Sequence, residues 1–337
     1  MKTVFMGTPE FALESLDALH ERGHQIVRVL CQADRPAGRG LKLVAGPVKR
    51  RALELGIPVL QPTRMKDPAL VEELRSLAPD LIVVAAYGKI LPRDVLQVPR
   101  LACVNVHASV LPRLRGAAPI HRAILDGEKT TGITIMLMDE GMDTGDMLLW
   151  EEMPIGPEDT AGDIHDRLAP RGAQLLVEAL DRLEAGAITP VKQDHTKATF
   201  APKLEPGLGR VEWRRPAAEV DRLIRGLSPF PGAHTFVTGL RLKLLGSKLV
   251  DRADDDDAVT PGRILEASAD RGLEIACGQG AVRPTREQPE GRKPMGAKEF
   301  IAGYRPRAGD VLRSDPPSEA DVTIADASDP VGAPDQA

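Results

Sequence analysis

Three polar residues in the middle of the chain have the types and spacing that acyl transfer requires. Asn105 and His107 lie two residues apart in the stretch 102–109, which reads ACVNVHAS. Because side chains alternate across a β-strand, we expect both on one face of a strand. An amide can donate a hydrogen bond to a developing oxyanion, and an imidazole can carry a proton. Burying two such groups on an apolar strand would be costly without a task or good partners.

A carboxylate follows in the stretch TGITIMLMDEGMDTGDM, where an apolar strand runs into a glycine-punctuated loop with Asp139, Asp143 and Asp146. A carboxylate near His107 would favour the charged imidazole and orient the ring. Taken alone, His107 fits better as a hydrogen-bonded structural residue and Asp143 as a turn residue. Their order along the chain, each at a strand end, favours a functional interpretation. Since no serine or cysteine is arranged like an activated nucleophile, direct transfer to an amine is favoured over an acyl-enzyme.

The elements that must position these residues alternate between short apolar runs and helical patterns. Strands are expected at 2–5, 24–32, 57–62, 81–87, 102–109, 131–139 and 147–155. Helices are expected at 11–23, 47–56, 67–78 and 161–186, the last as one helix or two that meet at Pro170. This alternation predicts an α/β fold with a doubly wound, mainly parallel sheet of Rossmann type. Ligands of such sheets lie beyond the carboxyl ends of the strands.

The second half of the chain lacks the regular alternation of strands and helices. Several short strands with turn signals, between about 234 and 288 and preceded by a helix at 216–227, predict a small β-barrel or sandwich. Pro284 interrupts one of these strands and should lie at an edge or a bulge. The predicted domains are a catalytic domain at 1–189, a linker at 190–207, a second domain at 208–309 and an acidic, disordered tail at 310–337.

The composition limits the class of protein. With 42% hydrophobic residues, 28% charged residues and a net charge of −5, the chain is not a generic nucleic-acid coat protein. Residues 190–309 nevertheless carry 21 Lys and Arg against 16 Asp and Glu. The three cysteines have no metal-ligand spacing, which indicates a reducing compartment and no metal. No signal-peptide core and no run of about 20 apolar residues is present, so we expect a cytoplasmic protein.

These residues resemble the signature of the folate-dependent formyltransferases. The likeness is carried by Asn105, His107, the segment 109–116 (SVLPRLRG) and Asp143-Thr144-Gly145, and it extends to about residue 305. It implies that Asn105, His107 and Asp143 are the catalytic set and that 10-formyltetrahydrofolate donates the formyl group. One departure is Val110, where leucine is usual. The implied folate site is bordered by Ser109, Val110, Leu111 and Pro112 and by Ala86, Tyr87, Gly88 and Ile90. The second domain is implied to be an open, OB-like barrel.

The acceptor of the formyl group must be inferred from other residues. The stretch 34–49, DRPAGRGLKLVAGPVK, is a glycine-rich and cationic loop that suits phosphate contacts. It is similar to the loop of those family members that formylate initiator methionyl-tRNA, so this tRNA is the implied partner. An aromatic content of 3% argues against stacking on bases. The residues expected to contact the tRNA backbone are Arg35, Arg39, Lys42, Lys203 and Arg210. We expect a monomer without an obligate protein partner or a membrane association.

Three alternatives remain open from the sequence. One is a formyltransferase for a sugar amine or a ribonucleotide amine, against which the loop at 34–49 counts. Another is an RNA-binding module with an inactive α/β domain, which retention of Asn105, His107 and Asp143 disfavours. The third is a nucleotide-dependent oxidoreductase. The turn Gly7-Thr8-Pro9 after the first strand lacks the glycine-rich dinucleotide fingerprint, which weakens this alternative.

Overall fold

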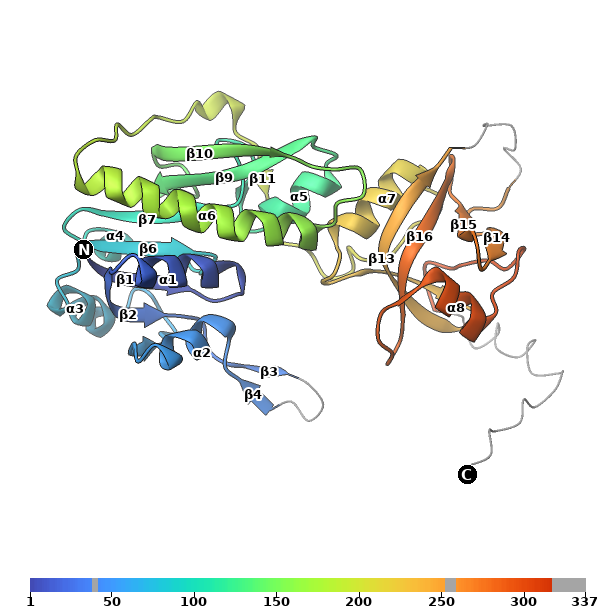
Figure 1. Cartoon of the computed structure of the whole chain (residues 1–337), viewed down its shortest axis with the longest axis horizontal. Coiled ribbons are helices and arrows are strands. Elements are labelled where there is room, and N and C mark those ends of the chain that lie inside the picture. Colours follow the sequence, from blue (N-terminus) through green and yellow to red (C-terminus); the bar gives the residue numbers. More distant parts are fainter. Residues whose placement is uncertain (38–41, 252–258, 317–337) are drawn as a thin grey trace. The chain divides into compact units, whose positions relative to one another are not determined.

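The chain folds into two compact units (Figure 1). The computed structural model describes residues 1–37, 42–251 and 259–316, with only the backbone of Ala37 and Lys42. Unit 1 contains Met1–Ala123, Glu128–Gly156 and Gly162–Leu204. Unit 2 contains Ile124–Gly127, Pro157–Ala161 and the described chain from Glu205 onward. Most of the segment 190–207, which we predicted to be a linker, therefore packs as part of unit 1.

Unit 1 is built on a seven-stranded sheet of order β10-β9-β7-β6-β1-β2-β5. Its strands are β1 (Lys2–Gly7), β2 (Gln25–Leu30), β5 (Val59–Leu60), β6 (Leu81–Ala85), β7 (Ala102–His107), β9 (Thr130–Leu137) and β10 (Met147–Pro154). Strands β5, β2, β1, β6 and β7 are mutually parallel, whereas β9 is antiparallel to both of its neighbours. The predicted mainly parallel α/β sheet is confirmed.

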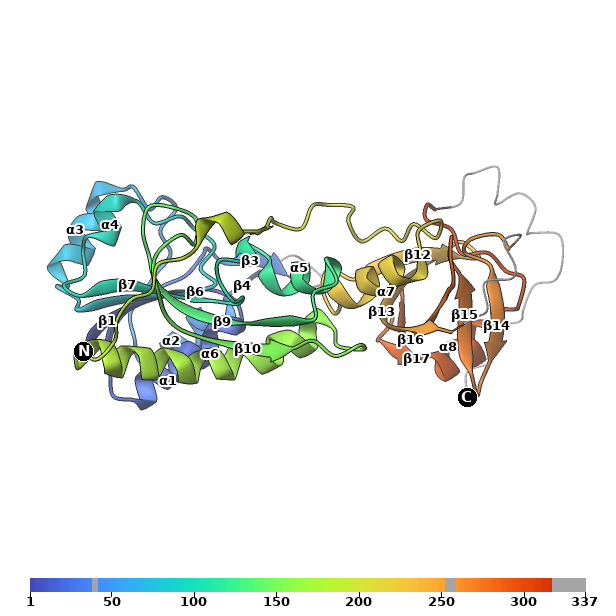
Figure 2. The ribbon, with the colours of Figure 1, turned by 90° about the horizontal axis from the view of Figure 1, so that it is seen from above.

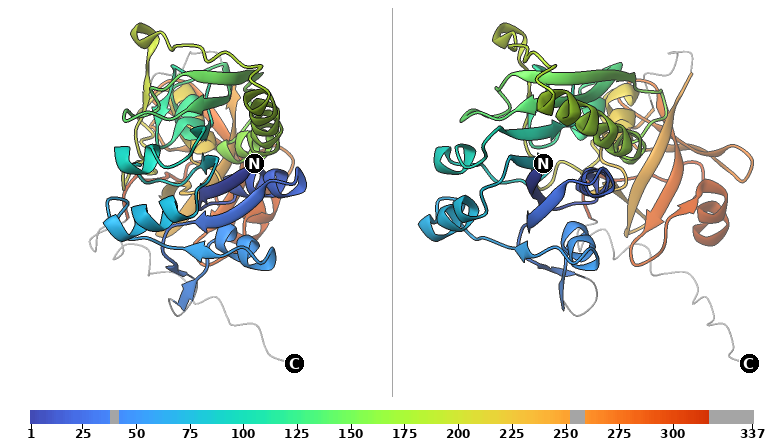
Figure 3. Two further views of the ribbon diagram at one scale, coloured as in Figure 1. Left: turned by 90° about the vertical axis from the view of Figure 1, so that its left-hand side faces the viewer. Right: turned by 60° about the vertical axis from the view of Figure 1, so that its left-hand side comes forward.

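Helices cover both faces of this sheet. Its long helices are α1 (Phe11–Glu21), α2 (Pro47–Glu54), α3 (Pro68–Ser76) and α6 (Ala161–Glu184). Figure 2 and the end-on view in Figure 3 show α3 and the short helix α4 (Arg93–Leu96) on one face, with α1 and α6 on the other. Helix α6 passes through Pro170 without a break, so the single-helix alternative holds.

Strands β2 and β5 are added to the sheet on one side of β1, and β6 and the later strands are added on its other side. The order of the sheet thus reverses between β1 and β6, and ligands of such sheets bind at the carboxyl ends of the strands at this topological switch point. All five residues of β6 are buried, as its continuous apolar run predicts. Gly7 ends β1 where space is tight: a Cβ there would lie 2.7 Å from the Ala12 Cβ and 3.0 Å from the Ala85 carbonyl oxygen. Only glycine fits this close approach without a shift of the backbone.

Several short elements escaped sequence-based prediction. They are β3 (Arg35–Ala37), β4 (Lys42–Val44), β8 (Arg115–Gly116), helix α5 (Pro119–Leu125), the 3₁₀ turn η1 (His195–Lys197) and β11 (Phe200–Ala201). Strands β3 and β4 form an antiparallel pair in the predicted cationic loop. Strand β11 pairs in parallel with β8. The missed strands and the 3₁₀ turn have only two or three residues, which is too short to produce a detectable hydrophobic period.

Unit 2 is an antiparallel sheet flanked by two helices. Its strands are β12 (Ala233–Val237), β13 (Leu240–Val250), β14 (Ile264–Ser268), β15 (Gly272–Ala276), β16 (Ala281–Pro289) and β17 (Met295–Gly296), with α7 (Ala217–Gly226) and α8 (Ala297–Tyr304). The order is β12-β13-β16-β15-β14, and β17 pairs with β16. Pro284 faces Ser247 beside a register shift in β13, in agreement with the predicted bulge.

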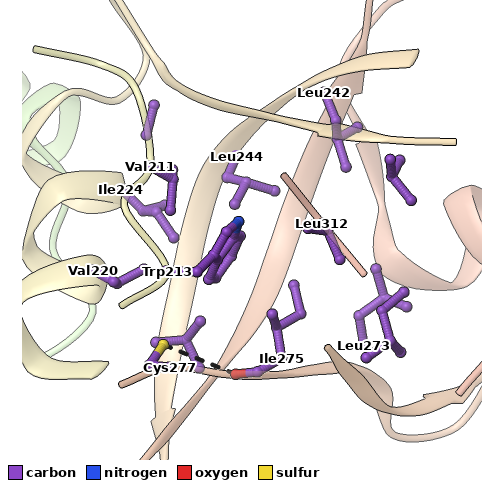
Figure 4. Packing of buried hydrophobic residues seen from close by; sticks show 14 of the residues in the cluster. Val211, Trp213, Val220, Ile224, Leu242, Leu244, Leu273, Ile275, Cys277 and Leu312 are labelled. Carbon is purple, nitrogen blue, oxygen red and sulfur yellow. Dashed lines mark hydrogen bonds between the residues drawn. The ribbon is translucent and has the colours of Figure 1, made fainter. Parts of the chain in front are cut away.

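Residues 310–313, which we predicted to belong to the disordered tail, connect the two ends of this sheet. The Arg313 and Phe236 backbones exchange hydrogen bonds of 2.8 and 2.9 Å on the β12 side, and the Leu312 N–H donates to the Gly262 carbonyl at 2.8 Å next to β14. The Leu312 side chain is 2% exposed and packs in the cluster around Trp213 (Figure 4). The sheet is thereby closed as a barrel. The rest of the predicted tail, from residue 317, lies outside the described residues.

The indole of Trp213 anchors this core through one polar contact. Its Nε1–H donates to the Thr235 hydroxyl at 3.0 Å, and that hydroxyl donates to the Arg313 carbonyl at 2.9 Å. A buried indole N–H is thus satisfied, and the closing segment is tied to β12 at the same point. No helix in the described part of the chain is long and apolar enough to cross a bilayer.

Glu287 generates a prediction for the stability of unit 2. It lies opposite Leu244 in the β16–β13 pair and is 0% exposed, and neither carboxylate oxygen has a hydrogen-bond partner within the described residues. Burial raises the pKa of this carboxyl from 4.5 to about 7. Its contribution to stability is therefore full below pH 4.5 and is lost as the pH rises to about 7. By linkage the loss is about 3 kcal/mol.

The Glu287→Gln variant should lack this pH dependence. Denaturant unfolding of both proteins between pH 4.5 and 7.5 measures the difference, and Glu290→Gln is the control because Glu290 is exposed. Parallel stability curves for wild type and Glu287→Gln would refute a raised pKa at this position.

Candidate active site

The end of β7 carries Asn105 and His107 on the face of the sheet that α3 and α4 cover. Cys103, two residues before Asn105 on the same face, packs with apolar side chains of α3 and α4. On the other face, Val106 meets α6 at Gly172, where a Cβ would lie 3.1 Å from a Val106 methyl. Asn105 is 9% exposed and His107 is 5% exposed. The strand thus delivers two buried polar groups to one site, as its alternation predicted.

A backbone carbonyl fixes the tautomer of His107. Its Nε2 lies 3.0 Å from the Leu114 carbonyl oxygen. Since a carbonyl can only accept, Nε2 must carry a proton, and the neutral ring has its lone pair on Nδ1. That Nδ1 lies 3.7 Å from the Asp143 Oδ2. The distance is longer than a hydrogen bond and within reach of strong Coulombic attraction once the ring is protonated.

The Leu114 carbonyl is presented by an unusual backbone conformation. Leu114 has a φ of 56°, which is uncommon for a residue with a branched side chain. Its N–H donates to the Thr199 hydroxyl at 2.9 Å, and the Arg115 N–H donates to the Thr199 carbonyl at 2.9 Å. The pairing of β8 with β11 continues this contact to Gly116 and Ala201. The segment at 199–201 therefore stabilises the loop that orients His107.

Asp143 is held from the same loop. Its φ is 52°, and its Oδ2 accepts a hydrogen bond from the Gly116 N–H at 2.8 Å. Asp139 instead organises its own turn by accepting from the Thr144 hydroxyl at 2.6 Å and the Gly141 N–H at 3.0 Å. Of the three candidate aspartates, Asp143 is the one whose carboxylate faces His107.

The Asn105 amide is available to a ligand. Among the described residues, its side chain has no hydrogen-bond partner, and its polar atoms are not among those sealed from solvent without a partner. An amide that reaches the surface of the site unpaired can donate to an incoming oxygen at small cost. It lies one strand repeat from the imidazole.

Two residues of the predicted folate segment 109–112 are engaged in contacts within the protein. The Ser109 hydroxyl donates to the Arg113 carbonyl at 2.6 Å, and the Ser109 carbonyl accepts from the Thr134 hydroxyl at 2.7 Å. Leu111 is 3% exposed and packs with Met136 and Met147. Val110 and Pro112 are half-buried, and the peptide before Pro112 is cis. Val110 and Pro112 are thus the members of this segment with accessible side chains.

The second predicted folate segment turns sharply after β6. Ala86 and Gly88 have φ values of 45° and 74°. Tyr87 is 1% exposed with its hydroxyl directed at the Met65 sulfur, and burial raises its pKa. Ile90, by contrast, is 82% exposed. The segment therefore offers main chain and the Ile90 side chain to a ligand.

The residues predicted to contact tRNA occupy different settings. Arg35 is exposed and donates to the Gln32 side chain at 2.6 Å. Lys203 is exposed, whereas Arg210 forms ion pairs with Glu212 at 2.6 Å and Asp315 at 2.7 Å. Arg39 and the Lys42 side chain lie outside the described residues. The tRNA contacts of all five residues remain predictions.

Comparisons with known proteins agree on one family. A family model described as "Formyl transferase" matches residues 1–180, and "Formyl transferase, C-terminal domain" matches residues 203–305. Methionyl-tRNA formyltransferase of Caldanaerobacter subterraneus subsp. tengcongensis is 45% identical over 93% of this chain and 100% of its own. The enzyme of that name from Stutzerimonas stutzeri is 51% identical over 88% of this chain and 92% of its own.

Solved structures show the same fold at lower identity. HypX from Aquifex aeolicus in complex with tetrahydrofolic acid aligns at 20% identity and a TM-score of 0.62, over 90% of this chain and 47% of its own. The N-formyltransferase from Helicobacter canadensis aligns at 18% identity and a TM-score of 0.63, over 84% of this chain and 99% of its own.

Thr199 provides a test of how the His107 partner is held. Thr199→Val removes the acceptor of the Leu114 N–H but keeps the size of the side chain, so the Leu114 carbonyl should lose its alignment. We expect kcat to fall by about fivefold, since one hydrogen bond contributes roughly 1 kcal/mol. Thr199→Ser retains the hydroxyl and should stay near wild-type activity. Equal activity of Thr199→Val and Thr199→Ser would contradict this role.

Proposed function

The chain belongs to the methionyl-tRNA formyltransferase family, and from this premise we propose that Asn105, His107 and Asp143 form its active site. The reaction transfers the formyl group of 10-formyltetrahydrofolate to the amino group of methionyl-tRNA. The observation that carries the proposal is the His107 imidazole, whose Nδ1 lies 3.7 Å from the Asp143 Oδ2 while Nε2 donates to the Leu114 carbonyl.

The proposed mechanism is a direct attack of the neutral amine on the formyl carbon. The Asn105 amide donates a hydrogen bond to the formyl oxygen as it becomes an oxyanion. His107 accepts a proton from the amine at Nδ1 and delivers it to the nitrogen that leaves the formyl carbon. Asp143 stabilises the imidazolium that exists between these two steps. The C–N bond to the amine forms first and gives the tetrahedral oxyanion, and the C–N bond to the folate breaks when this intermediate collapses and the folate nitrogen takes the proton.

The two predicted folate segments border the site from neighbouring strands. Residues 109–112 follow β7 and residues 86–90 follow β6, and the two strands are paired in parallel. Their carboxyl ends therefore lie at the same edge of the sheet. We propose that Val110, Pro112 and Ile90 contact the folate through their side chains, while Ala86, Tyr87 and Gly88 contribute main chain.

We further propose that the acceptor is initiator methionyl-tRNA and that the protein acts as a cytoplasmic monomer. The exposed cation Arg35, on the β3–β4 pair, and the exposed Lys203 support electrostatic contacts with a phosphate backbone. Cys31, Cys103 and Cys277 are buried free thiols, which suits a reducing compartment.

The acceptor is tested by supplying 10-formyltetrahydrofolate with initiator methionyl-tRNA, free methionine or an amino sugar nucleotide. We expect formyl transfer to the tRNA alone, measured as formylmethionine released by mild base. Transfer to the sugar alone would retain the chemistry and exclude the tRNA. No transfer to any acceptor would favour an inactive RNA-binding module.

The role of His107 predicts a separation of chemistry from binding. His107→Ala should lower kcat by about 10²- to 10⁴-fold, the usual effect of removing a general base. Binding of methionyl-tRNA, measured by filter retention, should stay within about twofold of wild type because His107 is buried at the strand end. A parallel loss of binding and kcat would remove the catalytic assignment.

A further inference from the structure

A glutamine from the segment we predicted to be a linker donates hydrogen bonds to the main chain of the Asp143 loop. The Gln193 Nε2 donates to the Asp143 carbonyl at 2.9 Å and to the Gly145 carbonyl at 2.7 Å. The Gln193 Oε1 accepts from the Arg115 Nε at 3.1 Å and Nη2 at 2.6 Å. Because a guanidinium only donates and carbonyls only accept, these partners fix the orientation of the amide.

Both members of this bridge are buried. Gln193 is 5% exposed and Arg115 is 4% exposed. The remaining described partner of Arg115 is the His195 Nδ1 at 3.0 Å, and within the described residues no carboxylate lies in ion-pair range of this guanidinium. Burying a cation against neutral acceptors is unfavourable for stability. Such an arrangement suggests that the bridge is retained for a purpose other than stability.

The bridge controls the conformation on which the Asp143 carboxylate depends. Asp143 has a φ of 52°, a left-handed backbone value that is uncommon for residues other than glycine but tolerated by aspartate. Its side chain is held by the Gly116 N–H at 2.8 Å, next to Arg115, and its main chain is held by Gln193. The hydrogen bond from Gln193 therefore holds the Asp143 backbone, and the hydrogen bond from Gly116 holds the carboxylate that faces His107.

We propose that Gln193 is a positioning residue that sets the geometry of Asp143 relative to His107. The inference rests on the proposed catalytic role of Asp143. Without the two donors of Gln193, the loop at 143–145 relaxes and the carboxylate moves away from the imidazole. The charged imidazole is then less stabilised, and proton transfer slows while substrate binding is retained.

Two variants separate the two halves of the bridge. Gln193→Glu keeps an acceptor for Arg115 but loses the two hydrogen bonds to the loop. Gln193→Met loses the acceptor as well as the two donated hydrogen bonds, in a side chain of similar size. We expect each to lower kcat by about ten- to a hundredfold, the usual effect of a displacement near 1 Å in an active site. KM for both substrates should change by less than about threefold. Val191→Ala is the control, because the Val191 side chain is exposed and its contacts to Met147 are made by main chain.

The split between kcat and KM is the readout for a positioning role. We expect a lower kcat with KM unchanged in Gln193→Glu and Gln193→Met, whereas wild-type kcat in both variants would overturn the proposal. Thermal melting of each variant checks that the fold is intact.

A double-mutant cycle with Asp143→Asn decides between positioning and general loss of structure. If Gln193 acts through Asp143, adding Gln193→Met to Asp143→Asn should lower kcat by less than about twofold more. Full additivity of the two losses would refute the inference and leave the proposed function intact. Wild-type activity of Asp143→Asn would instead remove the role of Asp143 and the inference with it.

Discussion

The hydrogen bond between the His107 Nε2 and the Leu114 carbonyl is the contact around which the site is organised. A strand buried on both faces cannot present an imidazole without a hydrogen-bond acceptor for its N–H group. By using a backbone carbonyl for one nitrogen, the chain leaves the other free and gives it a lone pair. This choice also imposes a constraint on the loop after β7, because Leu114 must adopt a left-handed backbone to reach the ring.

That constraint explains why the segment around 193–201 belongs to unit 1. Thr199 and β11 hold the loop that presents the Leu114 carbonyl, and Gln193 holds the loop that carries Asp143. Two loops from different strands are thus bridged by one short stretch of chain. The same stretch leads directly into unit 2. A perturbation that displaces it is therefore expected to reach both His107 and Asp143.

The sequence predicted the elements with clear periodicity and the residues that end them. The runs that became β1, β6, β7 and β9 were recognised because they are apolar and bounded by turns, and the alternation of Asn105 and His107 placed them on one face. The approach of Asp143 to His107 depended on a resemblance and on strand order. The contacts of Gln193 and Thr199 left no signal, since a single polar residue in an aperiodic segment looks the same whether buried or exposed.

The closure of unit 2 was missed for a related reason. Residues 310–313 begin a stretch rich in proline, alanine and aspartate, and its average composition gives no indication that Leu312 is a core residue. Leu312 is nonetheless buried, and the backbone around it pairs with both ends of the sheet. Main-chain pairing needs no particular side chains. Composition is therefore a poor guide to where a barrel takes its last strand.

The geometry also distinguishes direct transfer from a covalent intermediate. Two potential nucleophiles flank His107 along the chain, Cys103 on the same face of β7 and Ser109 just after it. Burial raises the pKa of the Cys103 thiol to about 12, so a thiolate is not accessible at neutral pH. The Ser109 hydroxyl donates its hydrogen bond to the Arg113 carbonyl at 2.6 Å and not to the imidazole. Neither group is activated by His107, which supports the proposed direct transfer over a covalent intermediate.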